Sequence, residues 1–210
     1  MEAAPSLAVA AVVLAAGRSQ RMAGGNKLLR DLGGRPMIAR TVDGVLDSGA
    51  APVLVVTGQQ GAELRAALAG RAVRFVDNPD FAEGLSSSLR AGLRALPPSA
   101  AGVLICLGDM PLTSPATLRR LLAAFAPGGA RSVWVPVAGG RRGNPVLWER
   151  RWFAAIAELR GDQGARSLLL RHPEAVEEVP VEDDGVLTDI DDAKALAAVQ
   201  EALAPNPAPG

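Results

Sequence analysis

The chain has 210 residues, of which 22 are basic and 22 are acidic, so its formal net charge is zero. This balance argues against a nucleic-acid-binding protein with a broad basic face, and the single Cys and single His exclude an intrachain disulfide and a zinc site built from Cys and His clusters. Apolar residues make up 49% of the sequence, which is enough to bury a sizeable core in one large domain or two small ones.

Short β-rich runs alternate with helical patterns along the chain. Residues 9–14 form a continuous apolar run, which is typical of a strand buried on both faces of a parallel sheet. Residues 36–48 carry apolar side chains at helical spacing, and Ser114 is expected to cap a helix over 115–125. The other predicted strands are 53–57, 73–76, 103–107, 133–137 and 175–181, and the other predicted helices are 63–69, 85–96, 150–159, 163–170 and 191–203.

This alternation predicts right-handed βαβ units and a mainly parallel sheet between two layers of helices, which is a three-layer α/β fold. Residues 1–203 are expected to form one domain, and the Pro-rich residues 204–210 a disordered tail. The first apolar run is too short to span a membrane and follows no basic segment, so we expect a soluble, cytoplasmic protein without membrane or nucleic-acid partners. Ligands of such sheets bind beyond the carboxyl ends of the strands, which directs attention to the loops after the first and fourth strands.

The loop after the first strand is rich in small residues. Residues 14–29 read LAAGRSQRMAGGNKLL. Ala15, Ala16 and Gly17 allow the backbone to approach a ligand closely, and successive amides there can form an anion-binding nest. The loop matches neither the P-loop pattern nor the dinucleotide-binding pattern GxGxxG.

Three cations follow the small residues. Arg18, Arg21 and Lys27 lie within ten residues of one another, with no acidic side chain before Asp31. A multiply charged anion such as a triphosphate is the ligand that this loop favours. The alternative is a mobile surface loop whose cations are solvated.

This loop resembles the signature loop of the nucleotidyltransferases that include the molybdenum-cofactor enzymes. The matching residues read Leu-Ala-Ala-Gly-Arg-Ser-x-Arg-Met, followed by Asn-Lys-Leu-Leu. The resemblance implies a Rossmann-like fold in which the loop wraps a nucleoside triphosphate, with Arg21 and Lys27 as catalytic residues that neutralise it. One departure is Ala23, which stands where the family usually has Gly. The nucleotide-binding residues that the resemblance implies in this loop are Leu14, Ala15, Ala16, Gly17, Arg18 and Ser19.

A carboxylate follows the fourth strand directly, in the segment Gly-Asp-Met-Pro that contains Asp109. A carboxylate held at the active edge suits Mg²⁺, because Mg²⁺ prefers hard oxygen ligands and a triphosphate supplies others. The alternative is a turn aspartate bonded to backbone amides. The segment also resembles the metal-binding motif of the same nucleotidyltransferases, which implies that Asp109 is a catalytic metal ligand.

A second acidic group precedes the last predicted helix. Asp189 and Asp191 alternate around Ile190 and would share one face of an extended backbone, although either can instead cap the helix. The family has an acidic or amide-rich segment here with its later member near the metal. By that resemblance Asp191 is the second metal ligand and Asp189 supports it.

Three further segments resemble elements of the family. The segment 78–92 resembles the third-strand loop and the helix it begins, which implies that Gly84 and Ser88 lie near the nucleobase; N-capping by a serine is the alternative. Asn144, in a Gly-Asn-Pro element, and Arg166, in a Gly-Asp-x-Gly-Ala-Arg element, are implied to bind the acceptor, the Arg through a phosphate. The alternative for Arg166 is an ordinary surface position.

The resemblance covers about residues 12–196 and implies transfer of a nucleoside monophosphate to a phosphate-bearing acceptor. The molybdenum cofactor cytidylyltransferases are the most similar subgroup, which implies CTP as donor, a molybdopterin-type phosphate as acceptor, Mg²⁺ as cofactor and a molybdenum hydroxylase as client. Ala-Ala-Gly in the first loop favours CTP over GTP within that resemblance. The alternatives are a sugar- or alcohol-phosphate cytidylyltransferase and a non-catalytic protein that binds the cofactor for a molybdenum hydroxylase.

Overall fold

Eight strands form one sheet in the part of the chain that the computed structural model describes, residues 8–17 and 25–203. The strands are β1 Val9–Ala15, β2 Val53–Thr57, β3 Val73–Asp77, β4 Gly102–Leu107, β5 Val133–Ala138, β6 Arg141–Arg142, β7 Val146–Glu149 and β8 Val176–Pro180. The α-helices are α1 Met37–Asp47, α2 Gly61–Ala67, α3 Leu85–Arg94, α4 Pro115–Ala124, α5 Phe153–Ala157, α6 Arg166–Arg171 and α7 Ala193–Leu203.

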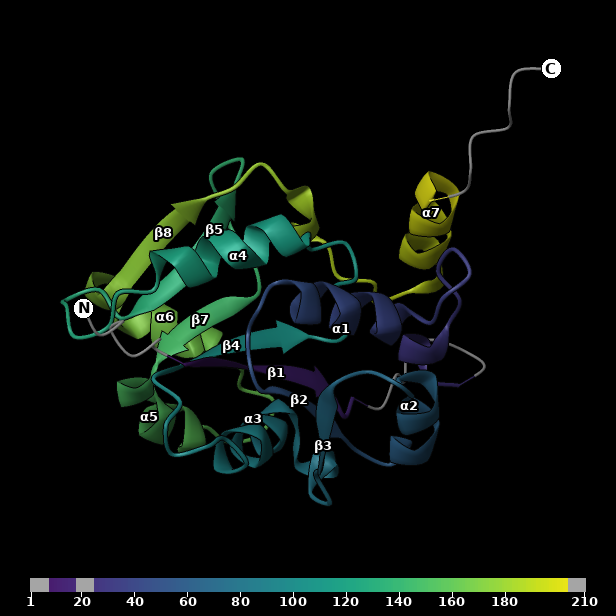
Figure 1. Cartoon of the computed structure of the whole chain (residues 1–210), viewed down its shortest axis with the longest axis horizontal. Helices are drawn as coiled ribbons and strands as arrows, with labels where there is room; N and C mark the ends of the chain where they lie inside the picture. Colours follow the sequence, from purple (N-terminus) through teal and green to yellow (C-terminus); the bar gives the residue numbers. More distant parts are fainter. Residues whose placement is uncertain (1–7, 18–24, 204–210) are drawn as a thin grey trace, which may run out of the picture.

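The strand order is β3-β2-β1-β4-β7-β5-β6, and β8 pairs with β5 (Figure 1). β1 lies parallel between β2 and β4, β3 is parallel to β2, and β8 is parallel to β5. β7 is antiparallel to both β4 and β5, and β6 is antiparallel to β5. The fold is therefore α/β with a mixed, mostly parallel sheet, which confirms the predicted fold class.

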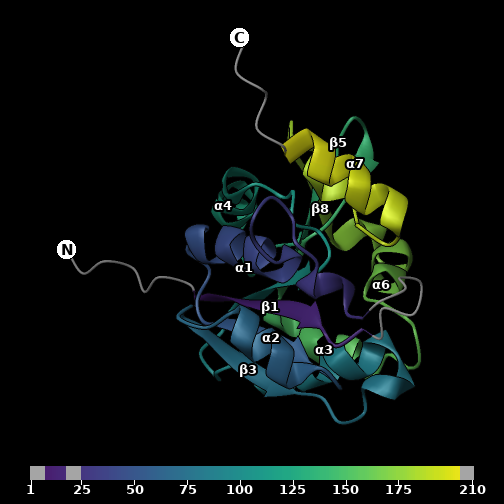
Figure 2. The ribbon, with the colours of Figure 1, turned by 90° about the vertical axis from the view of Figure 1, so that its right-hand side faces the viewer.

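Helices cover both faces of the sheet because the central strand is apolar on both. Val13 and Ala15 of β1 pack in the cluster that contains residues of α1, α2, α4 and α7. Val12 and Leu14 pack in the opposite cluster, which contains residues of α3, α5 and α6. Figure 2 views the molecule from the side toward which β1 runs, with α1 on one side of that strand and α3 on the other.

Most predicted elements are confirmed to within a few residues, including the cap of α4. Ser114 accepts a hydrogen bond at its Oγ from the amide of Thr117 at 3.2 Å. The predicted helix over 163–170 begins only at Arg166, because Gly161, with a φ of +60°, keeps the preceding residues in a turn. The predicted helix over 150–159 is a 3-10 turn, Arg150–Trp152, followed by the short α5.

The two antiparallel strands β6 and β7 were not predicted. β6 has only two residues and follows Gly139 and Gly140, both with positive φ. β7 has four residues between Pro145 and the turn that begins at Arg150, so it lacks the length and flanking signals by which a strand is recognised. Both strands lie in the half of the sheet away from β1.

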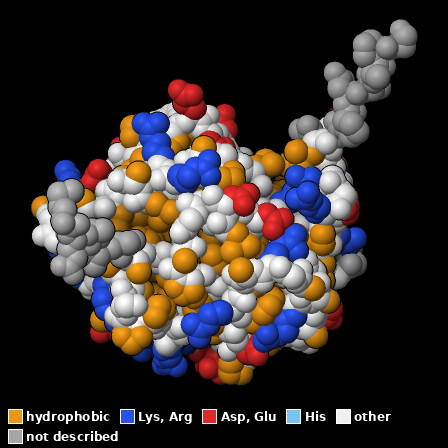
Figure 3. Space-filling model, viewed as in Figure 1, with side chains coloured by type: hydrophobic (Ala, Val, Ile, Leu, Met, Phe, Trp, Pro, Cys, Tyr) orange, Lys and Arg blue, Asp and Glu red, His pale blue; other side chains and the backbone are white. Residues whose placement is uncertain are grey.

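Three expectations from the sequence concern the surface charge, membrane-spanning segments and the C-terminal tail. On the face in Figure 3, Lys and Arg side chains are interspersed with Asp and Glu rather than gathered into one basic surface. No helix among the described residues is both long and apolar enough to cross a membrane. The predicted tail 204–210 lies outside the described residues.

Gly92→Ala tests the close contact between α3 and the sheet. A Cβ at Gly92 would lie 2.6 Å from Cγ1 of Val12, so helix and strand must separate. We expect the free energy of unfolding to fall by about 1–3 kcal/mol, as is typical of overpacking. Gly129→Ala is the matched control, because its Cβ would meet no atom closer than 3.9 Å. Equal urea midpoints for the two variants would contradict this packing.

Candidate functional site

The carboxyl ends of β1 and β4 meet at one edge of the sheet. Leu14 is the register partner of Leu107, and the amide of Gly108 donates to the carbonyl of Leu14 at 3.0 Å. A Cβ at Gly108 would lie 2.9 Å from that carbonyl oxygen, so glycine permits the close approach. The loop after β1 and the residue that follows Gly108 therefore lie side by side.

Lys27 joins two carboxylates at this edge. Its Nζ donates to Oδ2 of Asp109 and to Oδ1 of Asp191, at 2.6 Å in each case. Lys27 begins a 3-10 turn that Asn26 caps by accepting from the amide of Leu28 at 3.0 Å. Three segments that are far apart in the sequence thus converge on one ammonium group.

The backbone brings Asp191 to Asp109. The amide of Ile190 donates to the carbonyl of Asp109 at 3.0 Å, and the Ile190 side chain is fully buried. Asp189 lies on the other side of Ile190 and is exposed, whereas Asp192 caps α7 by accepting from the amide of Ala195 at 2.8 Å. The structure therefore places Asp191, rather than its acidic neighbours, beside Asp109.

The pairing keeps Lys27 charged. Burial lowers the pKa of Lys27, but the hydrogen bonds and charges of Asp109 and Asp191 outweigh burial, so this pKa lies above its ordinary value of 10.5. The stabilisation from this pairing is therefore fully present below pH 10.5 and is lost as the pH rises through the folded-state pKa. At neutral pH the site holds one ammonium and two carboxylates.

The residues present fit a divalent cation. Oδ1 of Asp109 is buried and has no hydrogen-bond partner among the described residues, and the carboxylate of Asp191 faces the same ammonium. Among the described residues no group of three or more His, Cys, Asp and Glu is arranged to hold a metal without other ligands. Two carboxylates that leave the remaining positions to phosphate and water are a typical arrangement for Mg²⁺.

A cleft of about 630 Å³ opens beside the two carboxylates. Its walls contain several of the predicted nucleotide-binding residues, as well as Lys27, Asp109 and Asp191. The predicted residues that line it are Leu14, Ala16, Gly17, Gly84 and Ser88. Ala15 is buried and lines a smaller hollow beside Asn26 and Gly58. The predicted residues Arg18, Ser19 and Arg21 lie outside the described residues.

Gly84 has a backbone that requires glycine. Its φ is +104°, and a Cβ there would lie 2.5 Å from Oδ1 of Asp162 and from the carbonyl carbon of Gly161. The turn at 161–162 is further joined to α3 by a hydrogen bond of 3.1 Å from the amide of Ser86 to the carbonyl of Gly161. Close contact between these two loops shapes one wall of the cleft.

The serines after Gly84 do not cap α3, so that alternative is wrong. Within the described part of the chain, no side-chain hydrogen bond caps the N-terminus of this helix. Instead Nδ2 of Asn78 donates to Oγ of Ser87 at 2.9 Å and to Oγ of Ser88 at 3.1 Å. Ser87 also donates to the carbonyl of Gly84 at 2.8 Å. This network holds Ser88 at the cleft wall.

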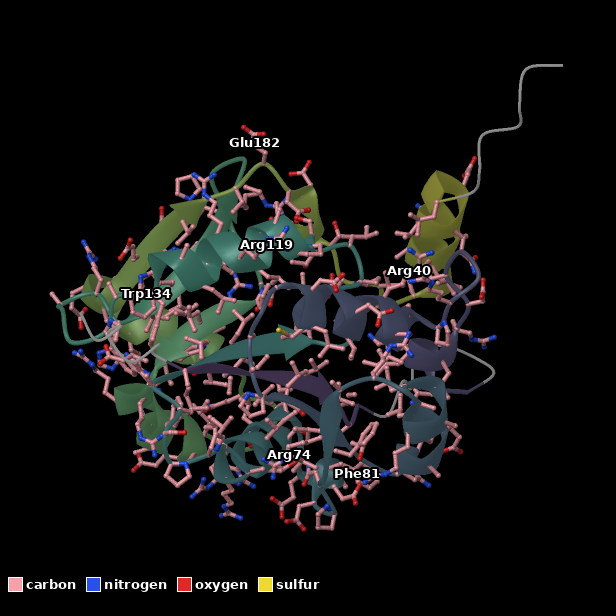
Figure 4. The ribbon with its side chains drawn as sticks, viewed as in Figure 1. Arg40, Arg74, Phe81, Arg119, Trp134 and Glu182 are labelled. Atoms are coloured by element: carbon pink, nitrogen blue, oxygen red, sulfur yellow. The ribbon has the colours of Figure 1, made fainter. Side chains whose placement is uncertain are left out.

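Other cleft residues were not assigned to the site from the sequence. Phe81, labelled in Figure 4, and Asp162 line the cleft and lie in segments that carried the resemblance, at 78–92 and 161–166. Leu107 lines it as the last residue of β4. The signal for Leu107 was its place at the carboxyl end of a strand that neighbours β1.

The two predicted acceptor residues lie together in a second pocket of about 270 Å³. Asn144 and Arg166 line this pocket, as do Trp148 and Leu170, a residue that is 74% exposed. It shares three wall residues with the larger cleft, namely Leu14, Leu85 and Leu107. The two spaces therefore adjoin, as a reaction between two bound molecules requires.

Two relatives are similar in sequence. The chain is 30% identical to nicotine blue oxidoreductase of Paenarthrobacter nicotinovorans over 188 residues. The matched stretch covers 87% of this chain and 92% of that protein. It is 37% identical over 132 residues to the bifunctional protein GlmU of Kineococcus radiotolerans, which covers 61% of this chain and 27% of that protein. The chain thus spans about a quarter of the length of GlmU.

Solved structures resemble the whole fold. Rv0371c of Mycobacterium tuberculosis has a TM-score of 0.82 and 29% identity, with 93% of this chain and 99% of that chain covered. A nucleotidyl transferase from Methanothermobacter has a TM-score of 0.82 and 28% identity, with 93% and 97% covered. Rv0371c has also been solved as a complex with manganese. A family model described as the MobA-like NTP transferase domain matches residues 11–176.

Proposed function

The chain belongs to the family of MobA-like NTP transferases, and we propose that it transfers CMP from CTP to the phosphate of a molybdopterin-type cofactor with Mg²⁺ and releases pyrophosphate. The observation that carries the transferase part is the Asp109–Lys27–Asp191 arrangement beside two adjoining pockets. One pocket suits the nucleotide and the other suits the acceptor. CTP and the acceptor are inferred from the first loop and from the acceptor-side segments.

In the proposed reaction an oxygen of the acceptor phosphate forms a bond to the α-phosphorus of CTP. The bond between the α-phosphorus and its bridging oxygen breaks, and pyrophosphate leaves with the electron pair. A phosphate monoester has a second pKa near roughly 6, so it is ionised at neutral pH and needs no general base. The task of the protein is to align two anions and to neutralise the charge that develops between them.

The described residues divide this task between them. Asp109 and Asp191 would hold Mg²⁺, which supplies positive charge at the phosphates when it is bound. Lys27 provides an ammonium that lines the cleft at the same edge, and it would pair with the triphosphate. Gly17 and Gly84 leave backbone exposed at the cleft, and Asn144 and Arg166 offer hydrogen bonds to the acceptor.

A panel of nucleotides tests the proposed donor and acceptor. Pyrophosphate release is measured with each of the four NTPs and Mg²⁺, with and without a molybdopterin-type cofactor. We expect release with CTP only when the cofactor is present, and a product that contains CMP. Release with GTP alone would contradict the choice of CTP, and release with sugar or alcohol phosphates in place of the cofactor would favour the alternative acceptor class.

A non-catalytic role gives a different result in the same assay. A protein that only carries the cofactor to a molybdenum hydroxylase would bind the cofactor or that client without releasing pyrophosphate. The two carboxylates and Lys27 support catalysis, because a carrier has no need of a cation-binding pair at the nucleotide cleft.

A second candidate function comes from the relative that matches nearly the whole chain. Nicotine blue oxidoreductase is covered over 92% of its length. A shared activity predicts that this chain would reduce nicotine blue. The test measures the loss of the dye's absorbance with each of several reductants supplied in turn, reduced nicotinamide and reduced flavin cofactors among them. The first loop lacks the GxGxxG pattern of dinucleotide binding, so nucleotidyl transfer stays the main proposal.

A further inference from the structure

One segment contacts both the proposed metal ligand Asp109 and the loop that contains Gly143 and Asn144, a predicted acceptor residue. Residues 183–191, which we call the strap, follow β8 and precede α7. Figure 4 labels Glu182, the residue just before the strap, at the far end of the molecule from Phe81. Near the end of the strap, the amide of Ile190 donates a hydrogen bond to the carbonyl of Asp109. In the middle of the strap, the carbonyl of Val186 accepts a hydrogen bond from the amide of Asn144 at 2.8 Å.

The strap packs against these loops with no spare room. A Cβ at Gly185 would lie 2.3 Å from the carbonyl oxygen of Leu112, and a Cβ at Gly143 would lie 2.3 Å from the carbonyl oxygen of Val186. The Val186 side chain is fully buried. Backbone therefore lies directly on backbone, and a shift at the start of the strap would be transmitted toward Asp191.

Asp183 anchors the start of the strap at the N-terminus of α4. Its Oδ2 accepts from the amide of Ser114 at 2.7 Å and from Oγ1 of Thr117 at 2.9 Å. Its Oδ1 accepts from the amide of Gly185 within the strap at 2.9 Å. The carboxylate thus joins the strap to the N-terminus of α4 through two donors, Ser114 and Thr117, at a helix end that favours negative charge, and its third bond lies within the strap.

Asp183 is held in its charged form. Burial raises the pKa of Asp183, but the hydrogen bonds from Ser114, Thr117 and Gly185 outweigh burial, and the pKa lies below its ordinary value of 3.8. Asp183 does not line the nucleotide cleft, so it has no direct role toward the triphosphate. Its three bonds serve the path of the strap.

We propose that Asp183 is a positioning residue that fixes the strap against α4 and thereby sets the carboxylate of Asp191 beside Asp109. The proposal rests on the proposed function, in which Asp109 and Asp191 hold the divalent cation. It adds a residue that acts on the metal centre through Asp191 and touches neither the cation nor a substrate.

Asp183→Asn keeps the size of the side chain but replaces one acceptor oxygen with an NH₂ group, which then faces N–H or O–H donors. Mn²⁺ binding without nucleotide is measured by titration calorimetry. We expect the Mn²⁺ affinity to fall by about 10–100-fold, the usual effect of losing a partner that orients a metal ligand. Asp184→Asn is the matched control, because this neighbouring carboxylate is exposed, and we expect no change.

A double-mutant cycle separates positioning from a general loss of stability. If Asp183 acts through Asp191, adding Asp183→Asn to Asp191→Asn should leave the residual Mn²⁺ affinity unchanged. Thr117→Val removes only one donor to Asp183 and replaces Asp183→Asn as the test variant if Asp183→Asn does not fold. We expect Thr117→Val to bind Mn²⁺ more weakly than the wild type, as Asp183→Asn does. Thermal unfolding without metal reports how much of each variant is folded.

The outcomes distinguish the two proposals. The positioning role would be overturned if folded Asp183→Asn bound Mn²⁺ with wild-type affinity. If Asp183→Asn does not fold, wild-type affinity in Thr117→Val would overturn it. In both cases the proposed metal centre would stand. An equal loss in the Asp191→Asn background would also overturn the positioning role. Absence of Mn²⁺ binding in the wild-type protein, both without nucleotide and with a non-hydrolysable CTP analogue, would instead overturn the metal centre of the proposed function.

Discussion

Asp109→Asn is expected to lower kcat by about 10³-fold, at every Mg²⁺ concentration tested. The Asp109 carboxylate follows β4 directly, pairs with Lys27 through Oδ2, and has a buried Oδ1 without a partner among the described residues. An amide keeps the shape of this group but loses its charge. Loss of one electrostatic contact that acts in the transition state costs up to about 4 kcal/mol, which corresponds to this change in rate.

The rate is measured as pyrophosphate release with CTP and acceptor, after urea unfolding has shown that the variant is folded. Asp47→Asn is the control, because this exposed carboxylate ends α1 away from the cleft, and its kcat should be unchanged. Asp109→Ala should be at least as slow as Asp109→Asn. A rate near that of the wild type in either variant would remove Asp109 from the site.

Lys27→Met is expected to have two effects of opposite sign. Triphosphate binding and transfer should weaken, with kcat/KM lower by about 100-fold, since loss of a charge-assisted contact costs about 1.5–3 kcal/mol. Mn²⁺ binding without nucleotide should become tighter, because the ammonium and the cation compete for the same two carboxylates. A general loss of structure would weaken both kinds of binding.

The chain offers a matched control for this variant in its only other lysine. Lys194 lies on α7 and is exposed, so Lys194→Met should leave both kcat/KM and Mn²⁺ affinity unchanged. Because the pKa of Lys27 is raised above 10.5, the effects of Lys27→Met should be constant between about pH 6 and pH 9. Unchanged kinetics in Lys27→Met would show that this ammonium does not contact the triphosphate.

Local signals predicted the half of the sheet that holds the site. β1, β2 and β4 are long, apolar and bounded by turns, and Ser114 has the residue type and position of a helix cap. The edge at which β1 and β4 end could therefore be located, and with it Asp109. The choice of Asp191 over Asp189 depended on resemblance. In the structure Asp191 pairs with Lys27, whereas Asp189 is exposed.

Long-range backbone contacts could not be predicted in this way. The hydrogen bond from Lys27 to Asp191 joins residues 164 positions apart, and the strap depends on two glycines that look like ordinary loop residues. β7 lies between β4 and β5, yet its four residues carry no periodic pattern. Asp183 has no motif around it and acquires its role only through the N-terminus of α4.

The central claim is that Asp109 and Asp191 hold a divalent cation once a nucleotide occupies the cleft. The most direct test is the anomalous scattering of Mn²⁺ in crystals grown with a non-hydrolysable CTP analogue. We predict a Mn²⁺ peak within about 2.5 Å of an oxygen of both Asp109 and Asp191, with the Lys27 ammonium moved to the phosphates. A peak away from these carboxylates, or Lys27 still joining both of them beside a bound nucleotide, would contradict the claim.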